Sequence, residues 1–266
     1  MSHPFAFRPG TIDEDIFKAV NVYNEYRLPD AFGADDVVLD VGTHIGSFCH
    51  AALARGAGRV HGFEADAENF RCAERNLAGF GDRVRLANVA AWRSDQGPTT
   101  LVFHPGDAVN TGGGNVGWAD VGREVPAVPF DDLVRRATDD GRRRVRFLKI
   151  DCEGSEFPIL LTSKTLHLVD EIAGEFHEFA GDFDPYDVPP RFRVAGVDRL
   201  RIDELVAALR RSGFEVSWER NGRTNIGMFY AKRVASPKAP SRLFRPHVWL
   251  LDKLRRRSAS KQDAAR

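Results

Sequence analysis

The hydrophobic positions along the chain follow two alternating patterns, short apolar runs and longer segments with apolar residues at helical spacing. Short runs bounded by polar turns predict buried β-strands, and helical spacing predicts amphipathic helices. The predicted strands are Val37–Val41, Arg59–Phe63, Val84–Ala90, Arg146–Ile150 and Glu171–Phe176. The predicted helices are Asp13–Tyr26, Ser47–Arg55, Asp66–Leu77 (with Asp66 as its N-cap), Phe130–Arg136, Ser155–Leu161 and Ile202–Ser212. This alternation predicts an α/β fold with a mostly parallel sheet and helices on both faces.

Shorter apolar segments complete the pattern. Thr99–Phe103 and Glu124–Val128 predict two strands around a glycine-rich loop, Asp107–Gly117, which we expect to lie over a substrate. Phe214–Trp218 and Ile226–Lys232 predict an antiparallel pair that closes the sheet. We therefore expect an N-terminal helical lead-in over residues 1–35, which belongs to the same domain as residues 36–234, and a distinct tail over residues 235–266.

A glycine loop follows the first strand. The order is D-x-G-x-x-x-G, from Asp40 through Gly42 to Gly46, and a helical pattern begins at once. Glycine permits the sharp turn and the close approach of a ligand. A dinucleotide-binding loop would have a third glycine, as G-x-G-x-x-G. An acid before the first glycine would repel a pyrophosphate but suits a ligand with a cationic amino-acid end, such as S-adenosylmethionine. The loop, with Thr43 and His44 at its centre, resembles motif I of the class I methyltransferases.

Polar residues follow the predicted parallel strands, where ligands of open α/β sheets bind. Glu64 ends the second strand, 18 residues after Gly46. An ionised carboxylate there can accept hydrogen bonds from both ribose hydroxyls of an adenosyl ligand. The competing interpretation is a solvated acid at a strand end. Asp151 and His177 occupy the corresponding places after two later strands.

Several motifs occur in the order found in one family. They are L-K-I-D-x-E-G-x-E at 148–156, D-x-x-I-F and E-Y-x-L-P within 13–29, V-L-D-V-G-x-x-I-G at 38–46, F-E-A at 63–65, and the stretch 88–91 with Gly97 after it. This order resembles the FkbM-type S-adenosylmethionine-dependent methyltransferases over about residues 10–233. The resemblance implies a class I methyltransferase (Rossmann-like) fold with a seven-stranded sheet. It also implies methyl transfer, usually to a hydroxyl of a sugar, polyketide or other secondary metabolite. Ala65, Asn88 and Ala90 would then lie near the cofactor, the last two near its adenine.

Methylation of a hydroxyl needs an acceptor for its proton, and a positioned base contributes about 10²–10⁴-fold. The candidates are Asp151, Glu153 and His177, of which Asp151 would also lie near the cofactor. Each candidate also has a purely structural alternative. Asp151 and Glu153 could be acidic charges that stabilise the N-terminus of the following helix, and His177 could be a surface or hydrogen-bonded structural histidine. Together with Glu175 these residues could instead bind a divalent metal ion, although no spacing in the sequence requires one. The sequence leaves the base and the metal open.

Composition and charge restrict the partners and the compartment. The formal net charge is zero, which argues against nucleic acid. Three cysteines without metal-ligand spacing indicate a reduced, cytoplasmic protein, and neither a signal peptide nor a membrane-spanning run is predicted. Two other functions remain open: a non-catalytic binding protein with this fold, and a nicotinamide-dependent oxidoreductase. The acceptor would be a small molecule or a lipid-linked sugar, and the sequence does not predict an oligomeric state.

The tail is electrostatically different from the rest of the chain. Residues 236–266 carry nine Lys or Arg against two Asp or Glu, so the preceding residues carry 29 basic against 36 acidic side chains. Within Leu243–Arg257, apolar residues recur at helical spacing beside basic ones. This pattern is typical of a helix that lies in an anionic membrane interface. The alternative is a terminal helix docked on the protein body, followed by a disordered end.

Overall fold

The computed structural model describes residues 5–117, 121–180, 182 and 187–234. The chain divides into two units, residues 1–233 and 234–266. The predicted tail, residues 235–266, lies outside the described residues, and the fold below is that of the first unit.

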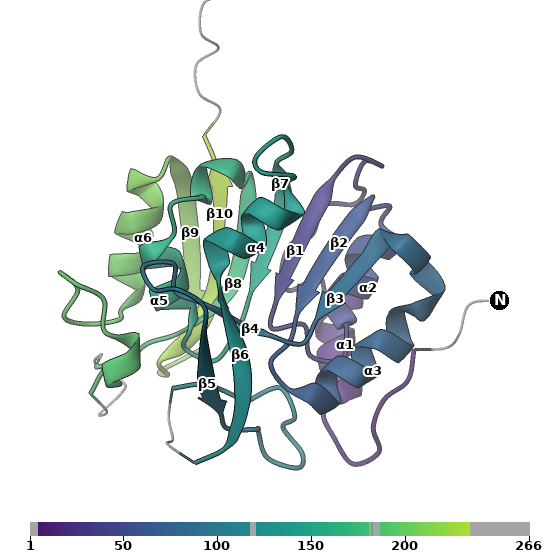
Figure 1. The fold of residues 1–266 in the computed structure, drawn as a ribbon, viewed down its shortest axis with the longest axis horizontal. Coiled ribbons are helices and arrows are strands. Elements are labelled where there is room, and N and C mark those ends of the chain that lie inside the picture. Colours follow the sequence, from purple (N-terminus) through teal and green to yellow (C-terminus); the bar gives the residue numbers. More distant parts are fainter. Residues whose placement is uncertain (1–4, 118–120, 181, 183–186, 235–266) are drawn as a thin grey trace, which may run out of the picture. The chain divides into compact units, whose positions relative to one another are not determined.

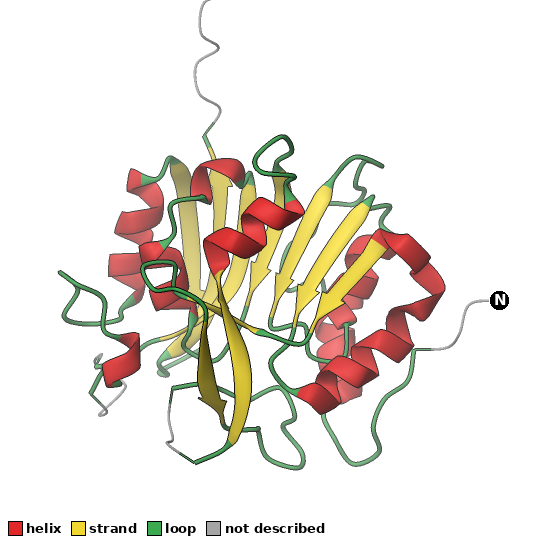
Figure 2. Ribbon diagram, viewed as in Figure 1, coloured by secondary structure: helices red, strands yellow, loops and turns green. Residues whose placement is uncertain are grey.

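Seven strands form the main sheet in the order β3-β2-β1-β7-β8-β10-β9 (Figures 1 and 2). Its strands are β1 (Val37–Val41), β2 (Arg59–Phe63), β3 (Val84–Ala87), β7 (Val145–Ile150), β8 (Glu171–His177), β9 (Phe214–Arg220) and β10 (Ile226–Arg233). Every neighbouring pair is parallel except those made by β10, which runs antiparallel to both β8 and β9. The predicted class I methyltransferase fold, with its antiparallel closing strand, is confirmed.

Helices cover both faces because the strands carry apolar residues on both sides. They are α1 (Asp13–Asn21), α2 (Ser47–Ala54), α3 (Ala67–Leu77), α4 (Phe130–Ala137), α5 (Glu156–Thr162) and α6 (Ile202–Arg211), and short 3₁₀ helices lie at Ala78–Arg83, Leu166–Leu168 and Pro190–Phe192. Within β1, Val37 and Leu39 pack in one core with α4, α5 and α6, whereas Val38 packs in the other with α2 and α3.

The predicted third strand is wrong in its second half. It breaks after Ala87, and Ala90–Trp92 forms β4, which joins a separate three-stranded sheet with β5 (Thr99–Phe103) and β6 (Arg123–Pro129). The side-chain amide of Asn88 causes the break, since it donates to the carbonyls of Glu64 and Ala65 at 2.8 and 3.0 Å. Figure 1 shows the small sheet beside the main one.

The predicted first helix is also too long, because α1 ends at Asn21 rather than Tyr26. Asn24 adopts a left-handed conformation (φ +53°), and its side chain bonds both backbone groups of Leu28. This local turn competes with the helix. It also brings Tyr26 into the interior, where its side chain is 6% exposed.

Candidate functional site

A cavity of about 460 Å³ lies at the carboxyl ends of β1, β2, β7 and β8. Its volume is in the usual range for small-molecule sites. Eight of the predicted site residues line it: Gly42, Thr43, His44, Glu64, Ala65, Ala90, Asp151 and Glu153. Four do not line it: Asp40, Gly46, Asn88 and His177. The glycine-rich loop lines it as well, through Asn110, Gly112 and Gly114.

The loop after β1 turns under the carboxyl end of β7. Gly42 has φ +79°, and a Cβ atom there would overlap the carbonyl oxygen of Asp151. The backbone N–H groups of Gly42 and Thr43 both donate to the carbonyl of Phe63, at 3.0 and 3.2 Å. Glycine is therefore required at position 42 by both conformation and space, and the loop is fixed against β2.

Glu64 connects this loop to the start of α3. Its Oε2 accepts from the backbone N–H of His44 at 2.7 Å, and its Oε1 accepts from that of Asp66 at 2.8 Å. Asp66 is the N-cap of α3, as predicted, and accepts from the N–H groups of Glu68 and Asn69. Burial raises the pKa of Glu64 to about 7 despite these bonds. The carboxylate thus lines the cavity with its orientation already set by the backbone.

Asp40 and Gly46 serve the loop from outside the cavity. Asp40 is fully buried, and its Oδ1 lies 3.4 Å from Nζ of Lys149. The expectation that this acid faces the cationic end of a ligand does not agree with its position, because it points into the core. Gly46 is the N-cap of α2 at φ +94°, and a Cβ there would come within 2.9 Å of Leu77. Gly46 therefore allows α2 and α3 to pack closely.

Lys149 links the two sides of the cavity, and the sequence analysis assigned it no role. Its ammonium donates to the carbonyls of Val41 and Gly42 and lies 3.9 Å from Oδ2 of Asp151. The hydroxyl of Tyr26 donates to that same Oδ2 at 2.7 Å. Burial alone would lower the pKa of Lys149, but Asp40 and Asp151 outweigh burial and raise it. The signal was visible in the sequence as a lysine inside an apolar strand, which needs buried partners.

His44 packs under the glycine-rich loop. Its Nε2 lies 2.9 Å from Oγ1 of Thr111 and 3.3 Å from Oδ1 of Asp13. Asp13 is fully buried and also accepts two side-chain hydrogen bonds from Arg8 at 2.9 Å. Burial would raise the pKa of Asp13, but hydrogen bonds from His44, Arg8 and Thr111 hold it well below its usual range. This network joins the N-terminal segment, the loop after β1 and the glycine-rich loop.

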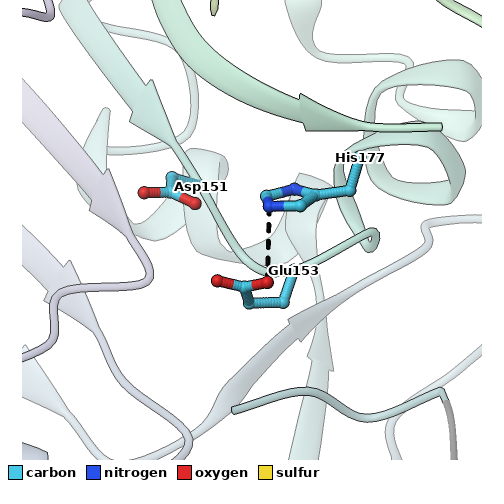
Figure 3. A group of neighbouring side chains, drawn as sticks. All are labelled: Asp151, Glu153 and His177. Carbon is cyan, nitrogen blue, oxygen red and sulfur yellow. Dashed lines mark ion pairs between the residues drawn. The ribbon is translucent and has the colours of Figure 1, made fainter. Parts of the chain in front are cut away.

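Acidic side chains gather at the ends of β7 and β8 (Figure 3). Glu153 takes a left-handed conformation (φ +54°) in the turn after β7, which directs its carboxylate towards His177. Nε2 of His177 lies 3.3 Å from Oε2 of Glu153 and 3.5 Å from Oε2 of Glu175. Asp151, Glu153 and His177 each offer a ligand atom within 4.8 Å of the others.

The charges in this cluster depend strongly on one another. Burial raises the pKa of Glu153 to about 7 and that of Glu175 to about 8. Burial would lower the pKa of His177, but Glu156, Glu153 and Glu175 raise it to about 10. In the absence of another cation, His177 therefore holds a proton at neutral pH and balances its acidic neighbours. A carboxylate, rather than His177, is then the group that can accept a proton.

These features define an α/β protein of the class I methyltransferase type, with its ligand cavity at the carboxyl ends of the parallel strands. The model of the FkbM methyltransferase domain matches residues 40–216. The chain therefore belongs to the FkbM methyltransferase family. It is an S-adenosylmethionine-dependent methyltransferase. The family therefore favours the methyltransferase over the other two functions considered from the sequence, a non-catalytic binding protein and a nicotinamide-dependent oxidoreductase.

Solved structures at low identity resemble the chain. A precorrin-6y C5,15-methyltransferase from Geobacter metallireducens is 16% identical, with a TM-score of 0.43 and coverage of 86% of this chain and 93% of that one. An rRNA methylase from Streptococcus thermophilus is 12% identical, with a TM-score of 0.43 and coverage of 87% and 99%. The comparison with curated proteins gave no match.

Proposed function

We propose that this methyltransferase methylates a hydroxyl group of a sugar, a glycolipid or a secondary metabolite. The observation that supports this most is the division of one cavity into two chemically different ends. Glu64 and the loop at Gly42 follow β2 and β1 and line one end, whereas Glu153 and Glu175 lie after β7 and on β8 and line the other. An alcohol is a weak nucleophile until its proton leaves, and carboxylates at the second end can accept that proton.

The first end fits S-adenosylmethionine. Gly42 lets the loop turn closely against the carbonyl of Asp151, and the Glu64 carboxylate is held in place by two backbone N–H groups. We propose that Glu64 accepts hydrogen bonds from the ribose hydroxyls and that the backbone of residues 42–44 contacts the cofactor. Ala65 and Ala90 line the same cavity, whereas Asn88 acts indirectly by fixing the turn after Glu64. Bound S-adenosylmethionine supplies an electrophilic methyl group on a cationic sulfur.

The second end orients the acceptor. The carboxylates of Glu153 and Glu175 can accept hydrogen bonds from a ligand, and Asn110 and Asn115 line the same cavity. Such a wall suits a polyhydroxylated molecule, because carboxylates and amides together supply hydrogen-bond acceptors and donors. Asp151 lies between the two ends, held by Tyr26 and Lys149. Correct placement of the two reactants is worth up to about 7–11 kcal/mol, so these contacts matter as much as the base.

The test is transfer of label from methyl-labelled S-adenosylmethionine into extracts of cell glycans, lipids and small metabolites. We expect label in a methyl ether, which survives mild alkali, and no transfer with a Glu153→Gln variant. Label in an alkali-labile methyl ester or in an amine would contradict methylation of a hydroxyl.

We also propose that the basic tail gives peripheral contact with an anionic membrane, as an enzyme acting on lipid-linked acceptors would need. Only the sequence supports this, because residues 235–266 lie outside the described residues. Within the described part of the chain, no helix is long and apolar enough to cross a membrane. Docking of the tail on the protein body is the alternative outcome.

A further inference from the structure

Carboxylate oxygens of three glutamates surround the His177 ring, yet its Nδ1 atom makes no hydrogen bond to the part of the chain that the structure describes. The residue is 7% exposed, and its buried Nδ1 has no hydrogen-bond partner among the described residues. Oε1 of Glu156 lies 3.5 Å from that atom. On the other side of the ring, Nε2 faces Glu153 and Glu175 at 3.3 and 3.5 Å. Two carboxylates that face a ring nitrogen at these separations need a positive charge, which either a proton on His177 or a bound cation can supply.

Glu156 holds the ring from behind. It is fully buried, and its two oxygens accept from the backbone N–H groups of Cys152 at 2.6 Å and Gly154 at 2.9 Å. Its position is therefore fixed by the turn after β7. Histidines that bind metals usually turn one ring nitrogen to a carboxylate or carbonyl and the other to the metal. Glu156 and His177 have this relation, with Nε2 directed at the remaining acids.

The separations suit a small cation. Ligand atoms about 2.1 Å from a common ion lie roughly 3.0–3.4 Å apart in octahedral or tetrahedral geometry. The 3.3 Å from His177 to Glu153 falls in that range, and the 3.5 Å to Glu175 lies just above it. Asp151 lies nearby, with one ligand atom from each of Asp151, Glu153 and His177 within 4.8 Å of the others, so a shared ion would draw these side chains closer together (Figure 3).

The charges point the same way. Asp151, Glu153, Glu156 and Glu175 supply four carboxylates, against which stand His177 and Lys149. Lys149 is already committed to Asp40, so His177 is the cationic side chain that Glu153 and Glu175 face. Buried charges are normally paired or bind a metal.

We propose that Asp151, Glu153 and His177 form a binding site for a divalent cation, with Glu175 as a further ligand and Glu156 as the residue that orients His177. Mixed carboxylate and imidazole ligands suit Mn²⁺, with Mg²⁺ as a weaker competitor. This inference rests on the proposed function for its chemical role: a cation there would bind the acceptor's hydroxyl oxygen and favour loss of its proton.

The experiment is binding of Mn²⁺ to full-length protein that has been treated with EDTA and dialysed, followed by electron paramagnetic resonance and without cofactor or acceptor. We expect one saturable site per chain, competition by Mg²⁺, and affinity at least tenfold weaker in Glu153→Gln and in His177→Gln. Glu171→Gln is the matched control, because Glu171 begins β8 and pairs with Arg146 and Lys232. Thermal unfolding of each variant identifies any that fails to fold, and Glu153 is the more exposed of the two.

Absence of saturable Mn²⁺ binding by the wild type, or equal binding by a folded Glu153→Gln variant, overturns the metal site. The cluster then works with the proton on His177 alone. The proposed function is judged separately: methyl ether formation at full rate in EDTA would reject the metal and keep the function. Mn²⁺ binding combined with label in an ester or amine would keep the site and reject the function.

Discussion

The two ends of the cavity differ in how their buried polar groups are satisfied. At the end that we assign to the cofactor, both oxygens of Glu64 accept hydrogen bonds from backbone N–H groups, and the loop at Gly42 is hydrogen-bonded to Phe63. At the end that we assign to the acceptor, Nε2 of His177 lies 3.3 Å from Glu153 and 3.5 Å from Glu175. The first end is built before its ligand arrives, whereas the second holds charges that depend on what binds there. We therefore expect substitutions at the first end to change binding and those at the second to change turnover.

The largest effect is expected at the acceptor end. Glu153→Gln removes a carboxylate that can accept the acceptor's proton or hold a cation, and both roles act on the chemical step. We expect kcat to fall by about 10²–10⁴-fold. Steady-state kinetics with an identified acceptor measure this, with Glu171→Gln as the control. A kcat within threefold of the wild type would remove Glu153 from the reaction.

The second-largest effect is expected at Lys149, which contacts residues on both sides of the cavity. Lys149→Met leaves Asp40 buried without its cation, and breaking a buried pair costs about 3–5 kcal/mol. The double variant Asp40→Asn/Lys149→Met removes both charges, so we expect it to recover most of the stability in chemical denaturation. Its kcat should stay low, because Asp151 has lost a neighbour that positions it. Lys232→Met, at an exposed ion pair on β10, should cost under about 1 kcal/mol. Full activity in the double variant would show that Lys149 only balances the charge of Asp40 and does not position Asp151.

The pH dependence of cofactor binding examines the other end. Glu64 has its pKa raised to about 7 by burial, and only its ionised form accepts hydrogen bonds with both oxygens. Affinity for S-adenosylmethionine should therefore rise as the pH increases through 7 and fall as Glu64 becomes protonated below it. Calorimetric titrations of S-adenosylmethionine between pH 6 and pH 8 measure this change in affinity, because the range brackets the Glu64 pKa of about 7. The rise should be absent in Glu64→Gln, and a rise that persists there belongs to another group.

The smallest effect on methyl transfer is expected from the tail. Removal of residues 236–266 should leave kcat on a soluble acceptor unchanged but abolish sedimentation with anionic liposomes at low salt. Each basic residue near such a surface contributes about 1 kcal/mol, so added salt should weaken the binding. Full-length protein that remains in the supernatant would show that the tail does not bind membranes.

The sequence predicted most strands of the main sheet, and the residues we assign to the cofactor end, better than it predicted the acceptor end. Gly42 and Glu64 were predictable because their roles depend on local backbone: a left-handed turn and a strand terminus. The break after Ala87 was not, because it depends on Asn88 bonding to Glu64 and Ala65, which are distant in sequence. Likewise the inward position of Asp40 follows from Lys149 on another strand.

The acceptor end shows the same limit. Asp151, Glu153 and His177 were selected as possible bases or ligands, but the spacing could not say which would face which. Only the turn at Glu153 and the fixed position of Glu156 bring them together. Glu64→Ala would leave the N–H groups of His44 and Asp66 unpaired, so it should destabilise the fold as well as weaken cofactor binding.

The division of the cavity is tested most directly by calorimetric titration of S-adenosylmethionine into two folded variants, Glu64→Gln and Glu153→Gln. We predict that Glu64→Gln weakens binding by about 1.5–3 kcal/mol, the size of a hydrogen bond to a charged group, while Glu153→Gln binds the cofactor with wild-type affinity. Wild-type affinity in Glu64→Gln, or an equal loss in both variants, would contradict the placement of cofactor and acceptor at opposite ends.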